Sequence, residues 1–358
     1  MNGAERDAAV LEIVERGRRA ARWVAAGRGH ERVYIGGAPL AGLGSPKSDI
    51  DLFVVTDSGR HADSEQVEFE GDRVDIEYVK LPSLRGAVDL CTTFRATAGN
   101  MRQIGYASRS RMDTLARFLL GETVVDDGVL ADLREHLEED RGEFLRLLVA
   151  RHCVDVQNIG DDVTGALLNG DLPGADYQSR ELLYRAADAY LCRCDDPYVN
   201  TKWLWAKWER TAGDTLGPGT RAVIRDPHLP DTLAAVRRNV WLAQDLTAMA
   251  ATGYTYRPLT TAAPEHCRRT REYALIPTRD EYLVMRRVNE GVALSRQGVL
   301  LWGLAHGRSE EDAVRAVREV LAEQDGADVP LAEISAYYRM LAGHGLFRPV
   351  SGETGMRG

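Results

Sequence analysis

The chain has 358 residues, more than a single domain usually has, so we expect two or three domains. Hydrophobic residues make up 44% of it and charged residues 28%, a balance typical of a globular protein with a sizeable core. The net charge of −9 at pH 7 argues against broad electrostatic capture of nucleic acid or of anionic membranes.

The amino-terminal residues 1–27 alternate charged and apolar residues at helical spacing and lack the continuous apolar run of a signal peptide. No apolar stretch approaches the length needed to span a bilayer. The five cysteines are scattered and odd in number, which favours reduced thiols over disulfides or a zinc site. We therefore expect a cytoplasmic protein with no membrane partner.

In the first third, apolar periodicity predicts a helix over residues 4–26, followed by strands over 31–36 and 49–55. Two short runs, 66–70 and 73–79, are separated by a turn and predict a hairpin. We expect a small mixed sheet with helices on one side, within a first domain of residues 1–125.

The middle third has helical periodicity. Residues 81–120 are helical with interruptions, and one helix ends near Gly121 before a short extended piece. Further helices are predicted over 130–158, 176–194 and 230–250, with Pro173 and Gly174 breaking the pattern. Residues 126–251 should therefore form a helical bundle.

Residues 252–270 show no period and are interpreted as a linker. After it, three extended runs (273–278, 281–287 and 291–295) precede three helices (296–306, 309–323 and 330–343), with Ser309 as an amino-terminal cap. This module covers 271–350, residues 351–358 form a tail, and the fold class is α+β.

Asp49 and Asp51 lie two residues apart in the second predicted strand, so their carboxylates share one face. Asp75 and Glu77 repeat this spacing in the second arm of the hairpin. If these strands pair, three or four carboxylates meet at one place, which is costly unless cations lie between them. Mg²⁺ prefers such oxygen ligands and supports phosphoryl chemistry. We therefore expect a metal site with enough carboxylates for two ions.

The same stretch resembles the polymerase-beta-type nucleotidyltransferase superfamily, whose pattern is a small Gly-Ser turn, an Asp-hydrophobic-Asp motif and a later Asp. The matching positions are Gly37, Ala38, Gly42, Ser48 to Leu52, and Asp75. The resemblance implies a nucleoside triphosphate as co-substrate and two Mg²⁺ ions, with Mn²⁺ as an alternative, held by Asp49, Asp51 and Asp75. It also implies that Asp75, with Glu77 nearby, activates the acceptor hydroxyl.

The family usually has serine where this chain has Ala38, and often arginine where Pro39 and Leu40 follow. Backbone N–H groups of Gly36 and Gly37 remain candidates for binding phosphate. Lys47 and Ser48 complete the nucleotide contacts that we expect in this loop.

Small members of the superfamily contact the triphosphate from a helical domain, and here Lys202 and Tyr184 are the candidates. A solvated lysine at a helix start is as good an interpretation of Lys202. Trp203, Trp205 and Trp208 are better explained as core residues than as a base-stacking surface.

In the carboxy-terminal module, Leu301 and Trp302 precede Gly307, and Leu341 precedes Gly345 and Leu346. Two families fit the order of its strands and helices. One is a DNA-reading winged helix, and the other, which the module resembles closely through these residues, is the PqqD-like recognition element that binds leader peptides of ribosomally synthesised natural products (RiPPs). Residues 271–348 contain ten arginines, no lysine and twelve acidic residues, whereas DNA readers are usually basic. This favours a peptide partner and no nucleic acid.

We expect the leader peptide to add as a strand beside residues 291–295 and to contact the last helix. The candidate residues are Val292, Ala293, Leu294, Leu331, Ile334, Tyr338 and Leu341. Ile334, Tyr338 and Leu341 share one stripe, and the sequence does not divide that stripe between core and groove.

Together these resemblances imply a cytoplasmic RiPP enzyme that transfers a nucleotidyl group to a precursor-peptide hydroxyl, in company with other modifying enzymes. The adduct is either the product or a leaving group. Three alternatives remain open: an antibiotic-type transferase acting on small molecules, transfer from a sugar nucleotide, and a non-catalytic precursor adaptor.

Overall fold

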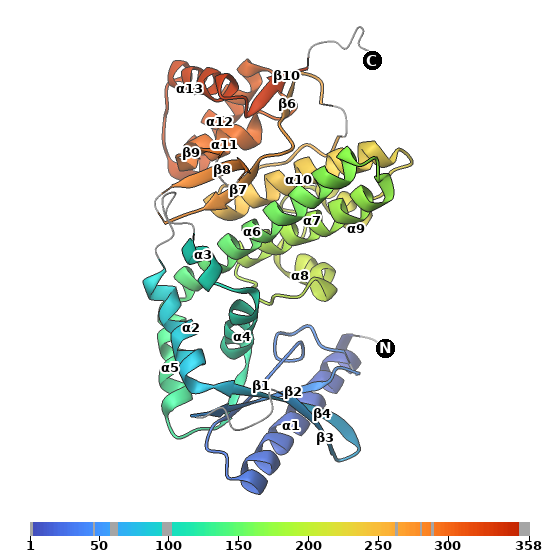
Figure 1. The fold of residues 1–358 in the computed structure, drawn as a ribbon, viewed down its shortest axis with the longest axis vertical. Helices are drawn as coiled ribbons and strands as arrows, with labels where there is room; N and C mark the ends of the chain where they lie inside the picture. The colour runs from blue at the N-terminus through green and yellow to red at the C-terminus, as the bar shows by residue number, and fades with distance from the viewer. Residues whose placement is uncertain are drawn as a thin grey trace. The chain divides into compact units, whose positions relative to one another are not determined.

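The computed structural model describes residues 3–45, 47–57, 64–94, 102–261, 264–279, 281–287 and 290–350, shown in Figure 1. The chain divides into two compact units. The first comprises residues 1–94, 106–147 and 197–199, and the second comprises 95–105, 148–196 and 200–358. The stretch 252–270, expected as a linker, lies inside the second unit, and the tail expected over 351–358 lies outside the described residues.

A mixed sheet of five described strands organises the first unit. In spatial order these are β3 (Ser64–Phe69), β4 (Asp72–Lys80), β2 (Ile50–Thr56), β1 (Val33–Gly36) and β5 (Glu122–Val125). β2 and β4 are parallel, and the other neighbours are antiparallel. The predicted hairpin is confirmed as β3 and β4, joined by Glu70 and Gly71, whose φ angles of 53° and 84° suit a tight hairpin turn.

Helices cover both faces of this sheet. On one face, α1 (Gly3–Arg28) packs Ala20, Ala21 and Val24 into a core with apolar residues from β1, β2 and β4. On the other face, Tyr34 stacks on Phe53 with ring centroids 4.7 Å apart. Phe118 of α4 (Arg109–Leu120) meets Tyr34 edge-on at 5.2 Å. The expectation of helices on one side only is therefore wrong. Successive residues of these strands point to opposite faces of the sheet, and because both sets are apolar, both faces are covered.

The helix predicted over 130–158 is instead two helices, α5 (Val129–Glu139) and α6 (Arg141–Leu168). Asp140 separates them with φ −95° and ψ 16°, and its carbonyl accepts the first hydrogen bond of α6, from Phe144 N. Acidic residues at 138–140 disfavour a helix end and suit a helix start, which explains the break. α2 (Leu81–Thr93) and the short α3 (Arg102–Tyr106) precede α4, as the interrupted helical pattern predicted.

The helical region of the second unit is built around α7 (Leu172–Arg193) and α10 (Thr232–Thr252), which pack against each other. Smaller elements complete it: the 3₁₀ turn η1 (Thr201–Trp203), α8 (Leu204–Thr211) and α9 (Pro218–Arg225). α7 begins four residues before its predicted start. Pro173 occupies its first turn, and the Asp171 carboxylate accepts from Gly174 N at 2.9 Å, so these residues cap the helix where we expected a break.

The carboxy-terminal part of the second unit contains the three predicted strands and three predicted helices. The strands β7 (Ala274–Pro277), β8 (Tyr282–Arg287) and β9 (Glu290–Leu294) form an antiparallel sheet with β9 at one edge. The helices are α11 (Arg296–Leu304), α12 (Glu310–Asp325) and α13 (Leu331–Gly343), and Ser309 caps α12 as predicted. A second small sheet was not predicted: β6 (Cys267–Arg269), within the expected linker, pairs with β10 (Phe347–Pro349).

The α+β class is confirmed at this level: a mixed amino-terminal sheet, a central helical region, and small antiparallel sheets with helices at the carboxy terminus. Among the helices of the described residues, none has the length and hydropathy of a membrane-crossing segment.

A charged pair lies fully buried in the second unit. Lys207 of α8 donates a hydrogen bond to Asp188 of α7, and neither side chain is exposed. His152 Nε2 lies 3.9 Å from Asp188, and burial lowers the pKa of His152 to about 4, so it is neutral at pH 7. The negative charge of Asp188 is therefore offset by Lys207.

We expect Lys207→Met to lower the free energy of unfolding by about 3–5 kcal/mol, because it leaves Asp188 buried without its counter-charge. Urea denaturation measures this loss. Lys207→Met combined with Asp188→Leu should recover most of it, and the exposed Lys80→Met should change little. A double variant as unstable as the single one would contradict this account.

Candidate functional site

The parallel pairing of β2 with β4 brings the predicted carboxylates together. Asp51 pairs with Asp75, and Phe53 pairs with Glu77, so Asp51, Asp75 and Glu77 share one face of the sheet. They line a pocket of about 550 Å³ to which Gln66 of β3 and Arg117 of α4 also contribute. The structure thus unites three of the four predicted carboxylates in one cavity.

Asp49 lies just before β2 and is more exposed than Asp51, with 56% of its side chain accessible against 28%. Its carboxylate is 3.5 Å from Arg73 Nη2, and the same nitrogen is 3.2 Å from Asp75 Oδ2. Arg73 therefore bridges Asp49 and Asp75. Such exposed ion pairs contribute at most about 1 kcal/mol, so a more strongly charged cation can displace the arginine.

The glycine turn after β1 packs directly against Asp51. Gly37 has φ +95°, and a Cβ on it would lie 2.4 Å from Asp51 Oδ2. A Cβ on Gly36 would lie 2.7 Å from the Phe53 ring. Both positions therefore require glycine, and the backbone of the turn adjoins the Asp51 carboxylate.

The remaining loop candidates occupy different surroundings. Ala38 is buried and its carbonyl accepts from Leu43 N at 2.8 Å, which closes the turn. Ser48 Oγ accepts from Ser45 N at 2.8 Å and so orders the segment before Asp49. Lys47 is exposed.

Arg117 was not among the predicted site residues. Its Nη1 lies 4.0 Å from Asp51 Oδ2, its Nε lies 3.0 Å from Asp113, and its guanidinium lies 5.8 Å from the Phe53 ring centroid. A cation therefore stands beside the carboxylates, brought there from α4 rather than from the glycine turn. The sequence signal was a charged residue within the otherwise apolar end of a predicted helix, between Ala116 and Phe118.

The electrostatics of the pocket centre on Asp51. Burial raises its pKa to about 6, Arg117 opposes the rise, and the neighbouring carboxylates Asp75 and Asp49 add to it. Tyr198, which also belongs to the first unit, is buried and has a raised pKa through desolvation. Ionisation of Asp51 in the folded protein therefore costs more free energy than it does in water.

Two observations fit a divalent cation at this place. Asp75 Oδ1 is buried and accepts no hydrogen bond within the described residues, and Asp51 bears a desolvated charge beside it. Among the described residues no three His, Cys, Asp or Glu side chains are already gathered as a complete ligand set. Asp51 and Asp75 would hold the ion, and Asp49 could join them once Arg73 is displaced.

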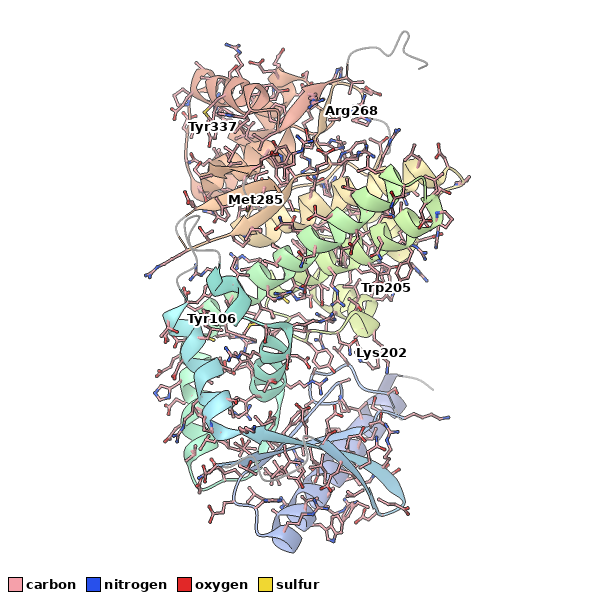
Figure 2. All side chains as sticks on the ribbon, in the orientation of Figure 1. Tyr106, Lys202, Trp205, Arg268, Met285 and Tyr337 are labelled. Carbon is pink, nitrogen blue, oxygen red and sulfur yellow. The ribbon has the colours of Figure 1, made fainter. Side chains whose placement is uncertain are left out.

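Tyr184 and Lys202, the candidate nucleotide contacts of the helical region, belong to the second unit. Tyr184 is half-buried on α7. Lys202 is exposed, its N–H donates to Asn200 Oδ1 at 2.9 Å, and its Nζ lies 5.3 Å from the Trp203 ring centroid (Figure 2). Trp208 is fully buried, which confirms the core interpretation for that residue, whereas Trp205 is partly exposed beside Arg221 and Arg225.

The peptide-contact candidates of α13 are divided between core and surface. Leu341 is fully buried, and Tyr338 packs against Phe347 with ring centroids 4.6 Å apart. Leu331 is 44% exposed and lines a shallow hollow with Val314 of α12. Of the candidates on β9, Leu294 is buried, while Ala293 is exposed and Val292 is half-buried on the edge strand.

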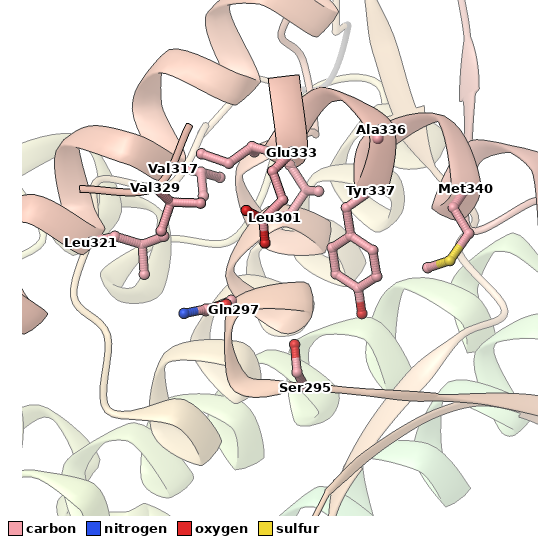
Figure 3. Close-up of a pocket in the computed structure, with 11 residues that line it drawn as sticks. Ser295, Gln297, Leu301, Val317, Leu321, Val329, Glu333, Ala336, Tyr337 and Met340 are labelled. Carbon is pink, nitrogen blue, oxygen red and sulfur yellow. The ribbon is translucent and has the colours of Figure 1, made fainter. Parts of the chain in front are cut away.

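The neighbouring face of α13 lines a groove of about 470 Å³ (Figure 3). Ile334 is the one predicted peptide contact in this groove, which lies between α13, α11 and α12. Ala336, Tyr337 and Met340 lie along the same side of α13, and Ser295, directly after β9, lies at the other side. Within the predicted stripe of α13, Leu341 thus packs in the core and Ile334 borders the groove, while Tyr337 and Met340 beside the stripe also line the groove.

Two comparisons of the sequence with known proteins gave no match. A scan against protein-family models finds no match, and a search of the curated proteins finds no similar sequence.

We expect Asp51→Asn to raise the free energy of unfolding of the metal-free protein by about 1–3 kcal/mol at pH 8. The folded-state pKa of Asp51 is about 6 against an ordinary 3.8, so the ionised carboxylate destabilises the fold above pH 6. The gain should shrink as the pH falls through 6 and vanish near 4. Thermal unfolding between pH 4 and 8 in EDTA measures it.

Asp49→Asn is the matched control, because Asp49 is more exposed and its replacement should change stability by less than about 0.5 kcal/mol. A gain for Asp51→Asn that is independent of pH would refute the assigned cause.

Proposed function

We propose that the first unit is a nucleotidyltransferase of the polymerase-beta type and that it transfers a nucleotidyl group to a hydroxyl of a ribosomally made precursor peptide. The observation that carries the proposal is the parallel register in which Asp51 pairs with Asp75 while Gly37 packs against Asp51. A glycine turn, a carboxylate pair and a third carboxylate on the neighbouring strand form the set that metal-assisted phosphoryl transfer needs.

In the proposed reaction a serine or threonine oxygen of the peptide attacks the α-phosphorus of a nucleoside triphosphate. A new P–O ester bond forms, the bond between the α-phosphorus and the β-phosphate breaks, and pyrophosphate leaves. Asp75, or Glu77 beside it, accepts the hydroxyl proton. Mg²⁺ held by Asp51 and Asp75, with Asp49, would neutralise and orient the phosphates when bound.

Arg117 supplies a cation that the altered turn lacks. Where the family has serine and often arginine, this chain has Ala38, Pro39 and Leu40, and Ala38 contributes no hydroxyl. The Arg117 guanidinium lines the same pocket as the carboxylates and can donate to phosphate oxygens in a bidentate way. We assign it to the triphosphate, together with backbone N–H groups of the turn.

The carboxy-terminal part of the second unit would recognise the leader peptide, as PqqD-like elements do. β9 is an edge strand of its sheet and leads into Ser295, which already lines the α13 groove. A peptide that pairs with β9 can therefore continue into an apolar groove. The module would hold the precursor while its acceptor residue reacts in the first unit.

The decisive activity test uses precursor peptides encoded beside the gene, each nucleoside triphosphate and Mg²⁺, with mass spectrometry of the peptide. Asp51→Asn and Asp75→Asn should each reduce the rate of adduct formation by about 10²–10³-fold. Asp57→Asn, an exposed aspartate at the end of β2 in the same unit, should leave the rate unchanged.

The mass added to the peptide also separates the alternatives. A hexose mass would indicate transfer from a sugar nucleotide, and modification of small molecules alone would indicate an antibiotic-type enzyme. Tight leader binding without any adduct, unaltered by Asp51→Asn, would replace the enzyme with a precursor adaptor.

We expect Met340→Glu to weaken leader-peptide binding by roughly tenfold or more, because it places a charge in the apolar groove. Fluorescence anisotropy of a labelled leader peptide measures the affinity. Leu331→Glu is the matched control: it makes the same kind of change on the same helix, outside the groove. Loss of binding with Leu331→Glu but not with Met340→Glu would move the peptide to the other face of α13.

A further inference from the structure

A second polar pocket, of about 410 Å³, lies in the second unit where α10, β6, β8 and β10 meet. Six arginines line it: Arg237 of α10, Arg268 and Arg269 of β6, Arg271, Arg286 of β8 and Arg348 of β10. Figure 2 labels Arg268 in this region. Neither the carboxylate site nor the peptide groove uses any of these residues.

Positive charge exceeds negative charge in this pocket. Glu272 is among the lining residues and lies 2.6 Å from Arg286 Nε, and Asp245 behind the wall lies 2.9 Å from Arg269 Nη1. Among the described residues, six arginines against these two carboxylates leave a formal charge of +4. Partial desolvation lowers the pKa of Arg271, and the neighbouring Arg237 and Arg268 lower it further. The guanidinium groups therefore repel one another in the absence of an anion.

One of the six is held rigidly in place. Arg269 is fully buried, its Nη2 donates to the Trp241 carbonyl at 2.9 Å, and its guanidinium lies 5.1 Å from the Trp302 ring centroid. Its Nε is buried and finds no hydrogen-bond partner in the described part of the chain. A buried N–H left unpaired is costly, so an acceptor that reached this group would lower the free energy of the folded protein.

We propose that this pocket binds a compact, multiply charged phosphate-type oxyanion: inorganic phosphate, pyrophosphate or the phosphate chain of a nucleotide. Guanidinium groups match phosphate oxygens with paired hydrogen bonds. They converge here from four elements on one hollow instead of following a groove, which suits a small anion better than an extended acidic peptide.

The bound anion would also act on stability. Its ligands belong to the last helix of the helical region and to both small sheets of the carboxy-terminal part, so it would hold these elements together. An anion that binds only the folded state raises the melting temperature, and the rise grows with the logarithm of the anion concentration once that exceeds the dissociation constant.

The test is isothermal titration calorimetry of the full chain with sodium pyrophosphate in EDTA, so that metal-dependent binding of nucleotide at the carboxylate site does not contribute. Arg237→Gln with Arg271→Gln should weaken binding by at least about tenfold and abolish the rise in melting temperature. Arg315→Gln removes the same charge from an exposed position on α12, beside Glu311, and should change neither.

Phosphate and ATP, titrated in the same way, identify which source of the anion binds most tightly. Asp51→Asn should leave pyrophosphate binding intact, because Asp51 does not line the arginine pocket. The binding result is therefore independent of whether the first unit is a nucleotidyltransferase. The proposal is overturned if the wild-type chain binds none of the three anions, or if the double variant, shown to be folded by circular dichroism, binds them as well as the wild type does. Arginine-dependent binding of an acidic peptide with no binding of pyrophosphate would also overturn it.

Discussion

The parallel pairing of β2 with β4 governs the chemistry of the first unit. It places Asp51 beside Asp75 on a sheet covered on both faces, where like charges repel and hydration is reduced. Arg117 and Arg73 offset part of this cost, one from α4 and one from within β4. Neither removes it, since Asp51 keeps a raised pKa and, within the described part of the chain, one oxygen of Asp75 has no hydrogen-bond partner. A cation between these carboxylates, as we propose, would offset the remaining cost.

Much of this unit could be predicted because its signals are local. Alternation along 49–55 and 73–79 identified both strands and the shared face of their carboxylates, and a glycine turn preceded them. Arg117 could not be identified in this way, since its distance from Asp51 depends on how α4 packs on the sheet. The break at Asp140 was also missed, because apolar periodicity continues across it.

The second unit shows the same division between local and long-range information. Its strands and helices after residue 271 were predicted within a few residues, except for β10. β6 and β10 are each three residues long, too short to show a period, and 77 residues separate them in the sequence. A single helix stripe does not reveal which of its flanks borders a groove, so the buried Leu341 was a candidate for peptide contact, whereas Tyr337 and Met340, which line the groove, were not. Likewise the net charge of −9 gives no sign of six arginines gathered in one pocket.

Arg269 joins the helical region to the carboxy-terminal sheets through Asp245, the Trp241 carbonyl and the Trp302 ring. The Trp241 indole in turn donates to the Arg269 carbonyl at 3.3 Å. A domain boundary at residue 270 would therefore separate β6 from its partner β10. A fragment that ended at this boundary would lack the carboxy-terminal part, and its Trp241 would be exposed. The carboxy-terminal part therefore does not stand apart from the helical region: a fragment that keeps these contacts would have to include α10.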